Sequence, residues 1–164
     1  MKLKKLYSSR EVAVLTGLTA RQLQWWDARR LFAPAVGTRR TEAGGFTERR
    51  YTPTDVIELQ LLADLLRRGF SVPRIRHLLG ALRDVFDVRL YEVIGEEGPM
   101  TLLISGDQLY LRDAVGQLFD MDDPAQALLV PPDDAKLKPL EVRERRKRTS
   151  GSERLSRGRR PASE

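Results

Sequence analysis

Two short helical patterns close to the start of the chain constrain its fold most strongly. They cover residues 9–16 and 20–30, and a turn at Gly17 separates them. Thr19 and Gln22 stand three positions apart, which is the spacing of a capping box that satisfies free amide donors at a helix start. A helix, a glycine-containing turn and a second helix are typical of a helix-turn-helix.

The second predicted helix has two different faces. Leu23 and Trp26 fall three positions apart and share one face, so they can pack on the first helix. Arg21, Gln22 and Trp25 project elsewhere and are left free. A solvent-facing helix start that carries Arg and Gln is equipped to read base edges in the major groove of DNA.

Several short motifs follow one another in the first half of the chain. They are Ser9-Arg10-Glu11-Val12-Ala13, Thr16-Gly17-Leu18-Thr19, Leu23-Gln24-Trp25-Trp26-Asp27, Gly45-Phe46, Arg49-Arg50-Tyr51, Thr54-Asp55-Val56, Leu65-Leu66-Arg67-Arg68-Gly69-Phe70-Ser71 and Ile75-Arg76-His77-Leu78-Leu79. In order and spacing they resemble the MerR-type winged helix-turn-helix family, over the N-terminal half only. The resemblance implies a homodimeric transcriptional regulator that binds a two-fold DNA site and acts by twisting or bending it.

The chain departs from the family pattern at several points. Trp25 and Trp26 stand where the family usually has two tyrosines, and Gln24 stands where it has an arginine. A tryptophan offers one N–H donor and no hydroxyl, so Trp25 cannot make the hydroxyl contact to phosphate that is expected of a tyrosine. The family's long C-terminal dimerisation helix is not evident, because the pattern turns to strands after Asp87.

Residues 35–48, here called the wing segment, are rich in Gly, Thr and Arg, with a predicted turn at Gly44-Gly45. The segment is predicted to form a two-stranded wing whose arginines straddle a phosphate backbone, although an arginine run is also typical of a solvated face. Arg21, Gln22 and Gln24 are expected to read bases. The full predicted set of DNA contacts is Arg10, Arg21, Gln22, Gln24, Trp25, Arg39, Arg40, Arg49, Arg50 and Tyr51.

Two longer helices are predicted next. Thr52-Pro53-Thr54-Asp55 is typical of a helix start, with a Thr cap, a proline at the first position and an acid in the first turn. That helix is expected to end at Gly69, and Ser71 is expected to cap another, which Val85, Phe86 and Leu90 can extend. Their leucines at helical spacing are interpreted as core.

After Asp87 the hydrophobic period becomes alternating and predicts short strands at residues 89–94, 100–105, 108–112, 117–120 and 127–130. Gly106-Asp107 is a two-residue hairpin signal. We expect this meander to pack on the helix near Leu82 to Phe86 or on a copy of itself. From Lys136 the chain is polar and basic, which predicts a disordered tail. Such a tail either binds phosphate groups of DNA without sequence preference or only keeps the protein soluble.

Charge alternates along the chain. Net charge is +8 over residues 1–84, −7 over 85–140 and +5 over 141–164, which together give the total of +6. The pattern favours modules with different partners. The predicted fold class is a mainly α winged helix-turn-helix domain, followed by a small antiparallel β (α+β) module and a disordered basic tail. The predicted boundaries are 1–84, 85–135 and 136–164.

Residues for catalysis or metal binding are scarce. The chain has no cysteine and one histidine, His77, which lacks a paired acid nearby in sequence. Asp120, Asp122 and Asp123 group carboxylates without the glycine and terminal Glu of a calcium loop. We therefore predict a protein that is not an enzyme and has no catalytic residue, metal or cofactor. No apolar stretch is long enough to span a bilayer, so a cytoplasmic, nucleoid-associated location is expected.

The leading hypothesis is a sequence-specific regulator that binds double-stranded DNA as a homodimer, with RNA polymerase as a further candidate partner. One alternative is an architectural or excisionase-like factor that bends DNA without an effector. Another is a protein-interaction adaptor that acts through the acidic sheet. Operator, effector and dimer interface are left open by the sequence.

Overall fold

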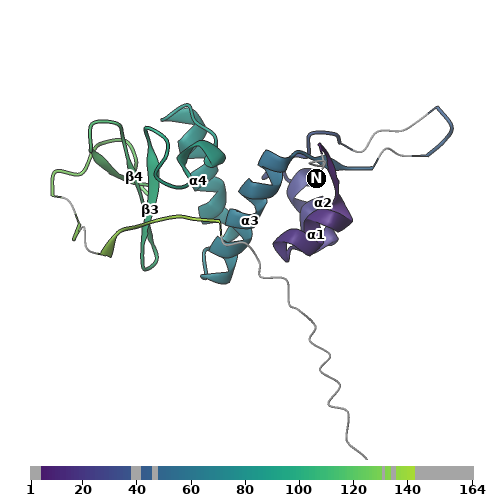
Figure 1. Ribbon diagram of the computed structural model, residues 1–164, viewed down its shortest axis with the longest axis horizontal. Helices are drawn as coiled ribbons and strands as arrows, with labels where there is room; N and C mark the ends of the chain where they lie inside the picture. The colour runs from purple at the N-terminus through teal and green to yellow at the C-terminus, as the bar shows by residue number, and fades with distance from the viewer. Residues whose placement is uncertain (1–4, 38–41, 46–47, 131, 134–135, 143–164) are drawn as a thin grey trace, which may run out of the picture.

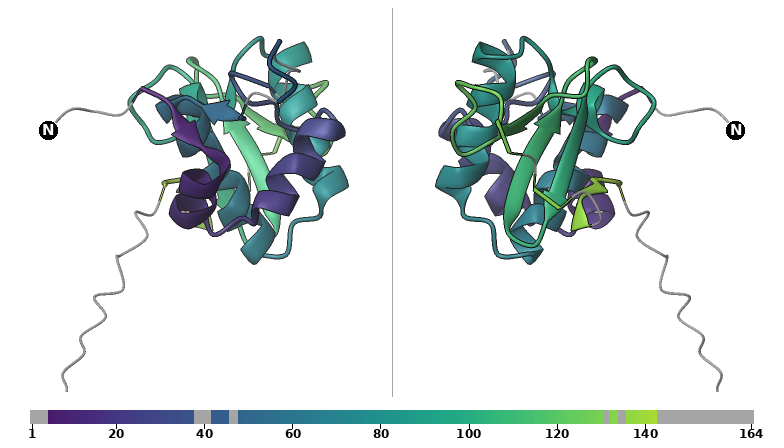
Figure 2. Two further views of the ribbon diagram at one scale, coloured as in Figure 1. Left: turned by 90° about the vertical axis from the view of Figure 1, so that its right-hand side faces the viewer. Right: turned by 90° about the vertical axis from the view of Figure 1, so that its left-hand side faces the viewer.

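A long central helix separates two groups of elements in the computed structural model, which describes residues 5–37, 42–45, 48–130, 132–133 and 136–142. This helix is α3, Pro53–Arg67. Figure 1 shows α1 (Ser9–Thr16) and α2 (Ala20–Ala28) on one side of it, with α4 (Val72–Asp84) and the four-stranded sheet on the other. In the right-hand view of Figure 2 the sheet lies in front of the helices.

The first two helices begin with capping boxes. α1 spans Ser9–Thr16 and α2 spans Ala20–Ala28. The Ser8 Oγ accepts the Glu11 N–H at 3.2 Å, and the Thr19 Oγ1 accepts the Gln22 N–H at 3.0 Å. The two predicted helices are confirmed, except that α2 ends two residues earlier than predicted, since Arg30 adopts a left-handed φ of 56°.

Two short strands and two longer helices complete the N-terminal half. β1, Tyr7–Ser8, pairs antiparallel with β2, Arg50–Tyr51. α3 starts with the predicted Thr52 cap, and α4, Val72–Asp84, starts with the predicted Ser71 cap. The predicted extension of α4 through Leu90 is wrong. Asp87 adopts a φ of 53°, which turns the chain out of the helix.

The predicted strand at residues 89–94 is wrong. Its centre, Leu90–Val93, is a 3₁₀ helix, η1. Leu90 and Val93 are both buried in the core, three residues apart, as one face of a 3₁₀ helix places them. The Glu92 carboxylate accepts the Arg89 N–H at 2.6 Å and so closes the turn.

The remaining strands form one antiparallel sheet in the order β5-β4-β3-β6. The elements are β3 (Thr101–Ser105), β4 (Gln108–Arg112), β5 (Leu118–Asp120) and β6 (Lys138–Pro139). The predicted hairpin between β3 and β4 is confirmed, and Gly106 supplies a φ of 61° that its first turn position requires. The strand predicted at 127–130 does not form. Leu128 donates one bond to the Leu118 carbonyl, and Leu129 is 98% exposed.

Residues 138–140 were predicted to lie in the disordered tail, and this part of the prediction is wrong. Leu103 pairs with Pro139, and the Leu140 N–H donates to the Leu102 carbonyl at 3.1 Å. Leu140 itself is 1% exposed and belongs to the core. A single buried leucine with two backbone pairings orders a segment whose composition is otherwise polar. Residues 143–164 lie outside the described part of the chain.

One hydrophobic core runs through both groups of elements. It joins Val12 and Leu23 of the first helices to Leu62 of α3 and to Leu102 and Leu111 of the sheet. As predicted, the sheet packs near the end of α4: the Phe86 and Phe119 rings meet edge-on with centroids 5.1 Å apart. Helices followed by a small antiparallel sheet agree with the predicted fold class, while the boundary between domains at residue 84 stays a prediction.

Candidate nucleic-acid interface

Helix α2 has one buried and one exposed face. Leu23 and Trp26 are buried, and Trp26 is only 2% exposed. Arg21 and Trp25 are exposed, as predicted for this face, and Gln24 is exposed beside them. The burial of its apolar face fixes the helix on the core, and three side chains that can meet a ligand stand on the other side.

Gln22 is also exposed, but its side chain has a structural task. Its Oε1 accepts the Thr19 N–H at 2.9 Å and thereby completes the capping box. Gln22 can therefore contact a base only through its amide NH₂ group, unless its oxygen gives up the hydrogen bond to Thr19 and with it the cap. Within the described residues, Gln24 makes no such bond to the helix start. It is therefore the freer side-chain amide on this face.

An arginine outside the predicted set of DNA contacts lies beside Trp25. The guanidinium of Arg29 lies 4.6 Å from the centre of the Trp25 ring, and this ring is 43% exposed. The pair presents a flat aromatic surface with a positive charge. Their spacing of four residues on one helix is the signal that could have identified it. Arg76 of α4 donates to the Arg29 carbonyl at 3.1 Å and ties the two helices together.

The arginines that follow the wing segment have acidic partners. The Arg49 Nε donates to the Asp27 Oδ2 of α2 at 2.8 Å, and both side chains are mostly buried. Arg50 pairs with Glu48 at 3.0 Å, and its backbone exchanges two hydrogen bonds with Val36. Arg49, which directly precedes β2, therefore links this strand to α2, the helix whose outer face carries Arg21. Two further predicted residues, Arg39 and Arg40, lie outside the described residues.

Tyr51 and Arg10 have opposite environments. Tyr51, predicted to contact DNA, is 1% exposed and pairs with Tyr7 across the two-stranded sheet. Burial raises the pKa of the Tyr51 hydroxyl, although the nearby Arg49 charge lowers it. The side chain supports the strand from inside and does not face a ligand. Arg10 is exposed near the start of α1.

Residues 7–82, which include α1 to α4 up to Leu82, match the sequence profile of the MerR HTH family regulatory protein. This half of the chain is a MerR-type helix-turn-helix region. The resemblance inferred from its motifs is thus confirmed over the N-terminal half.

Longer relatives carry similar names. The chain is 25% identical over 151 residues to HTH-type transcriptional regulators of Mycobacterium bovis and Mycobacterium tuberculosis, a match that covers 78% of this chain and 66% of each relative. The match thus leaves about a third of their length without a counterpart here. Among solved structures, a MerR family transcriptional regulator from Bacillus cereus is 29% identical, with 44% of this chain and 50% of that chain covered at a TM-score of 0.36.

A cleft lies where the MerR-type region meets the segment that follows it. It has a volume of about 330 Å³ and lies between residues 31–33, which follow α2, and the helices α3, α4 and η1. Two buried carboxylates of α3, Asp55 and Glu58, form part of its wall, and Arg89 bridges them. Burial raises the pKa of Glu58, and the charge of Arg89 beside it lowers it.

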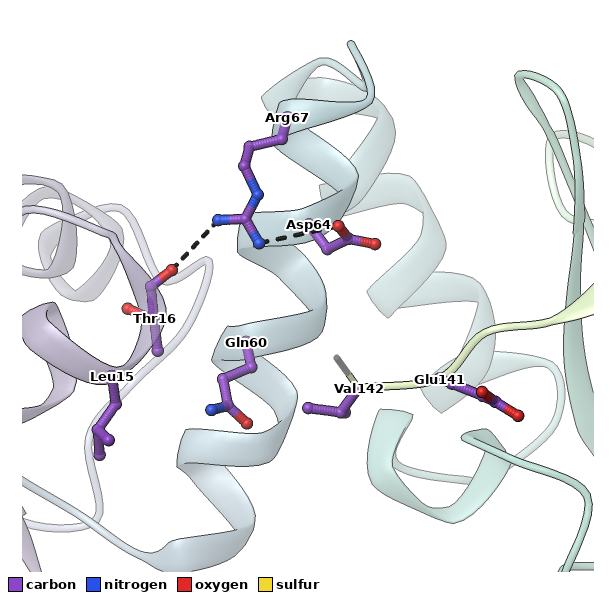
Figure 3. A pocket seen from close by; sticks show the side chains of 7 residues that line it. All are labelled: Leu15, Thr16, Gln60, Asp64, Arg67, Glu141 and Val142. Atoms are coloured by element: carbon purple, nitrogen blue, oxygen red, sulfur yellow. Dashed lines mark hydrogen bonds and ion pairs between the residues drawn. The ribbon is translucent and has the colours of Figure 1, made fainter. Parts of the chain in front are cut away.

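A second cavity of about 310 Å³ lies between α1, α3 and Glu141-Val142 (Figure 3). Arg67 spans one end, where it donates to the Thr16 carbonyl at 3.3 Å and pairs with Asp64 at 3.8 Å. Within the described residues, no group of three or more His, Cys, Asp or Glu side chains is arranged to hold a metal ion. Nor does any helix of that part of the chain have the length and apolarity to cross a membrane.

Proposed function

We propose that this chain is a transcriptional regulator that binds double-stranded DNA with α2 in the major groove. The observation that carries the proposal is the pair of faces on α2: Trp26 anchors one face in the core while Arg21 and Gln24 stand exposed on the other. Arginine pairs with two acceptors of guanine, and glutamine pairs with the donor and acceptor of adenine. The match of residues 7–82 to a regulatory family supports the same function.

Different side chains take different parts in this proposal. Arg21 and Gln24 read bases, whereas Trp25 with Arg29 stacked on it packs against the sugar-phosphate backbone. Arg10 and Arg50 contact flanking phosphates, and the wing segment adds Arg39 and Arg40. Arg49 is assigned another role, because its ion pair with Asp27 makes it a link between the wing segment and α2.

Charge supports one orientation on DNA. Residues 1–84 carry a net charge of +8, and residues 85–140 carry −7. A duplex attracts the first region and repels the second. The sheet therefore faces away from DNA, where it is available to a second copy of the chain or to RNA polymerase. A homodimer on a two-fold site in the nucleoid, and the predicted division into three modules, belong to this proposal.

Selection of bound fragments from a genomic DNA pool with the purified full chain tests the function. We expect a recurring sequence of two related half-sites, with binding that weakens steeply as salt rises. Similar affinity for unrelated fragments would instead support a DNA-bending factor without sequence preference. Failure to bind any duplex at low salt would refute the proposal.

A further inference from the structure

Two buried carboxylates on one helix require a counter-charge. Asp55 and Glu58 lie three positions apart at the start of α3, and their side chains are 9% and 5% exposed. Burial of like charges so close together is unfavourable unless a cation and hydrogen bonds compensate them. Arg89 supplies this compensation from beyond α4: its Nη2 lies 3.4 Å from the Asp55 Oδ1 and also donates to the Glu58 Oε1.

Asp55 serves two neighbours at once. Its Oδ1 faces Arg89, while its Oδ2 accepts the Thr52 N–H at 2.9 Å, and the Thr52 Oγ1 accepts the Asp55 N–H at 3.1 Å. Thr52 directly follows β2, whose last residue is Tyr51. The carboxylate that binds Arg89 is therefore the same group that holds the backbone at the end of this strand.

The strand in turn leads to α2. Arg50 exchanges two backbone hydrogen bonds with Val36 in the wing segment, and Arg49 holds Asp27 of α2 at 2.8 Å. A continuous set of contacts thus runs from Arg89 through the α3 start to the helix with the exposed Arg21. Such a chain of contacts can couple Arg89 to the position of α2, and this coupling can be measured.

We propose that Arg89 is a positioning residue for DNA binding. It fixes the start of α3 and, through it, β2, which pairs with Val36 of the wing segment and directly follows Arg49, the ion-pair partner of Asp27 in α2. The DNA part of this inference rests on the proposed function. Arg89 lies outside residues 7–82, so the MerR-type region would depend on a side chain from the acidic segment that follows it. Loss of Arg89 leaves two buried carboxylates to repel each other beside the Thr52 cap.

The test compares full-length Arg89→Gln with Arg83→Gln. Arg83 lines the same cleft, and its replacement removes the same charge. Its side chain, however, is exposed and pairs with the neighbouring Asp84. We expect Arg89→Gln to speed hydrogen exchange of the Arg50 N–H in the DNA-free protein and to weaken binding of a selected site by at least about fivefold. The salt dependence of binding should stay unchanged, because Arg89 touches no phosphate. Arg83→Gln should leave exchange and affinity unchanged.

Glu58→Gln provides the matching half of a double-mutant cycle. Added to Arg89→Gln, it removes one buried charge and should restore part of the lost affinity and of the exchange protection; should the single variant not fold, the double variant replaces it in the comparison. Unchanged exchange at Arg50, or faster exchange with unchanged affinity, would overturn the proposal. If the wild-type chain binds no duplex, the proposed function fails, and the exchange measurement alone decides whether Arg89 positions β2.

Discussion

The helical region and the sheet are held in shape by interactions of very different range. α1, α2 and α3 each begin with a capping box, whose two hydrogen bonds join residues three positions apart. The sheet needs Leu103 to pair with Pro139, and the junction needs Arg89 to reach Glu58, 31 residues earlier. Local order can be recognised in a sequence window, whereas the closing contacts of the second region depend on the complete fold.

The two tryptophans of α2 give the sharpest test of its two faces. Trp26→Ala should lower the free energy of unfolding by about 3–5 kcal/mol, because it empties a fully buried site. Trp25→Ala is the matched control: it should leave stability nearly unchanged and weaken DNA binding. Chemical denaturation and DNA titration measure the two effects. Equal losses of stability in both variants would contradict the assignment of the faces.

The second prediction concerns the late strand. Leu140→Ala should cost about 2–5 kcal/mol of stability, since Leu140 is buried where β6 meets β3. Leu129→Ala makes the same change at a fully exposed site and should cost almost nothing. If one core joins helices and sheet, the Leu140 variant should unfold in a single transition by both the tryptophan fluorescence of α2 and the amide signals of β3 and β4. Two separate transitions would divide the region of residues 1–84 from the sheet.

A third prediction concerns base reading. Arg21→Ala should weaken binding of a selected site by about 1–3 kcal/mol and relax the preference at one base position in each half-site. Arg83→Ala loses the same charge away from α2 and should retain both affinity and preference. Selection from a randomised site with each variant measures this. An unaltered preference in the Arg21 variant would mean that α2 does not read bases.

The smallest expected effect is a pH dependence at the junction. Burial raises the folded-state pKa of Glu58, so the folded chain holds its proton more tightly than the unfolded chain does. The stability that this proton contributes is fully present below the ordinary glutamate pKa and is lost as pH rises through the raised value. Glu58→Gln should remove that decline. Denaturation measures the free energy of unfolding of both proteins at several pH values in this window. The same pH dependence in both proteins would contradict the pKa shift.

Much of the helical region could be predicted from the sequence because its signals are local. The predicted bounds of α1 match the structure, and the hairpin of β3 and β4 follows from alternating residues around Gly106. The strand predicted at η1 is wrong, because the spacing of Leu90 and Val93 alone does not distinguish a strand from a 3₁₀ helix until the neighbouring core is known.

The candidate site divides in the same way. The exposed face of α2 could be predicted from the spacing of Leu23 and Trp26. The partner of Arg49 could not, because Asp27 lies 22 residues away and nothing in the sequence selects it among the other acids. Tyr51 is among the predicted DNA contacts, and only the packed core shows that its side chain is covered.

The position of β6 has a consequence for the chain during its synthesis. The outer edge of β3 at Leu103 and Ile104 is made well before its partner residues, Lys138 and Pro139, leave the ribosome. Until then an apolar strand has unpaired backbone groups along one side, which is the kind of edge that joins nascent chains to one another. α4, which is made before the sheet, can cover one face of it in this interval, but it cannot cover its edge. Slow translation between residues 105 and 138 would therefore prolong the period of greatest aggregation risk.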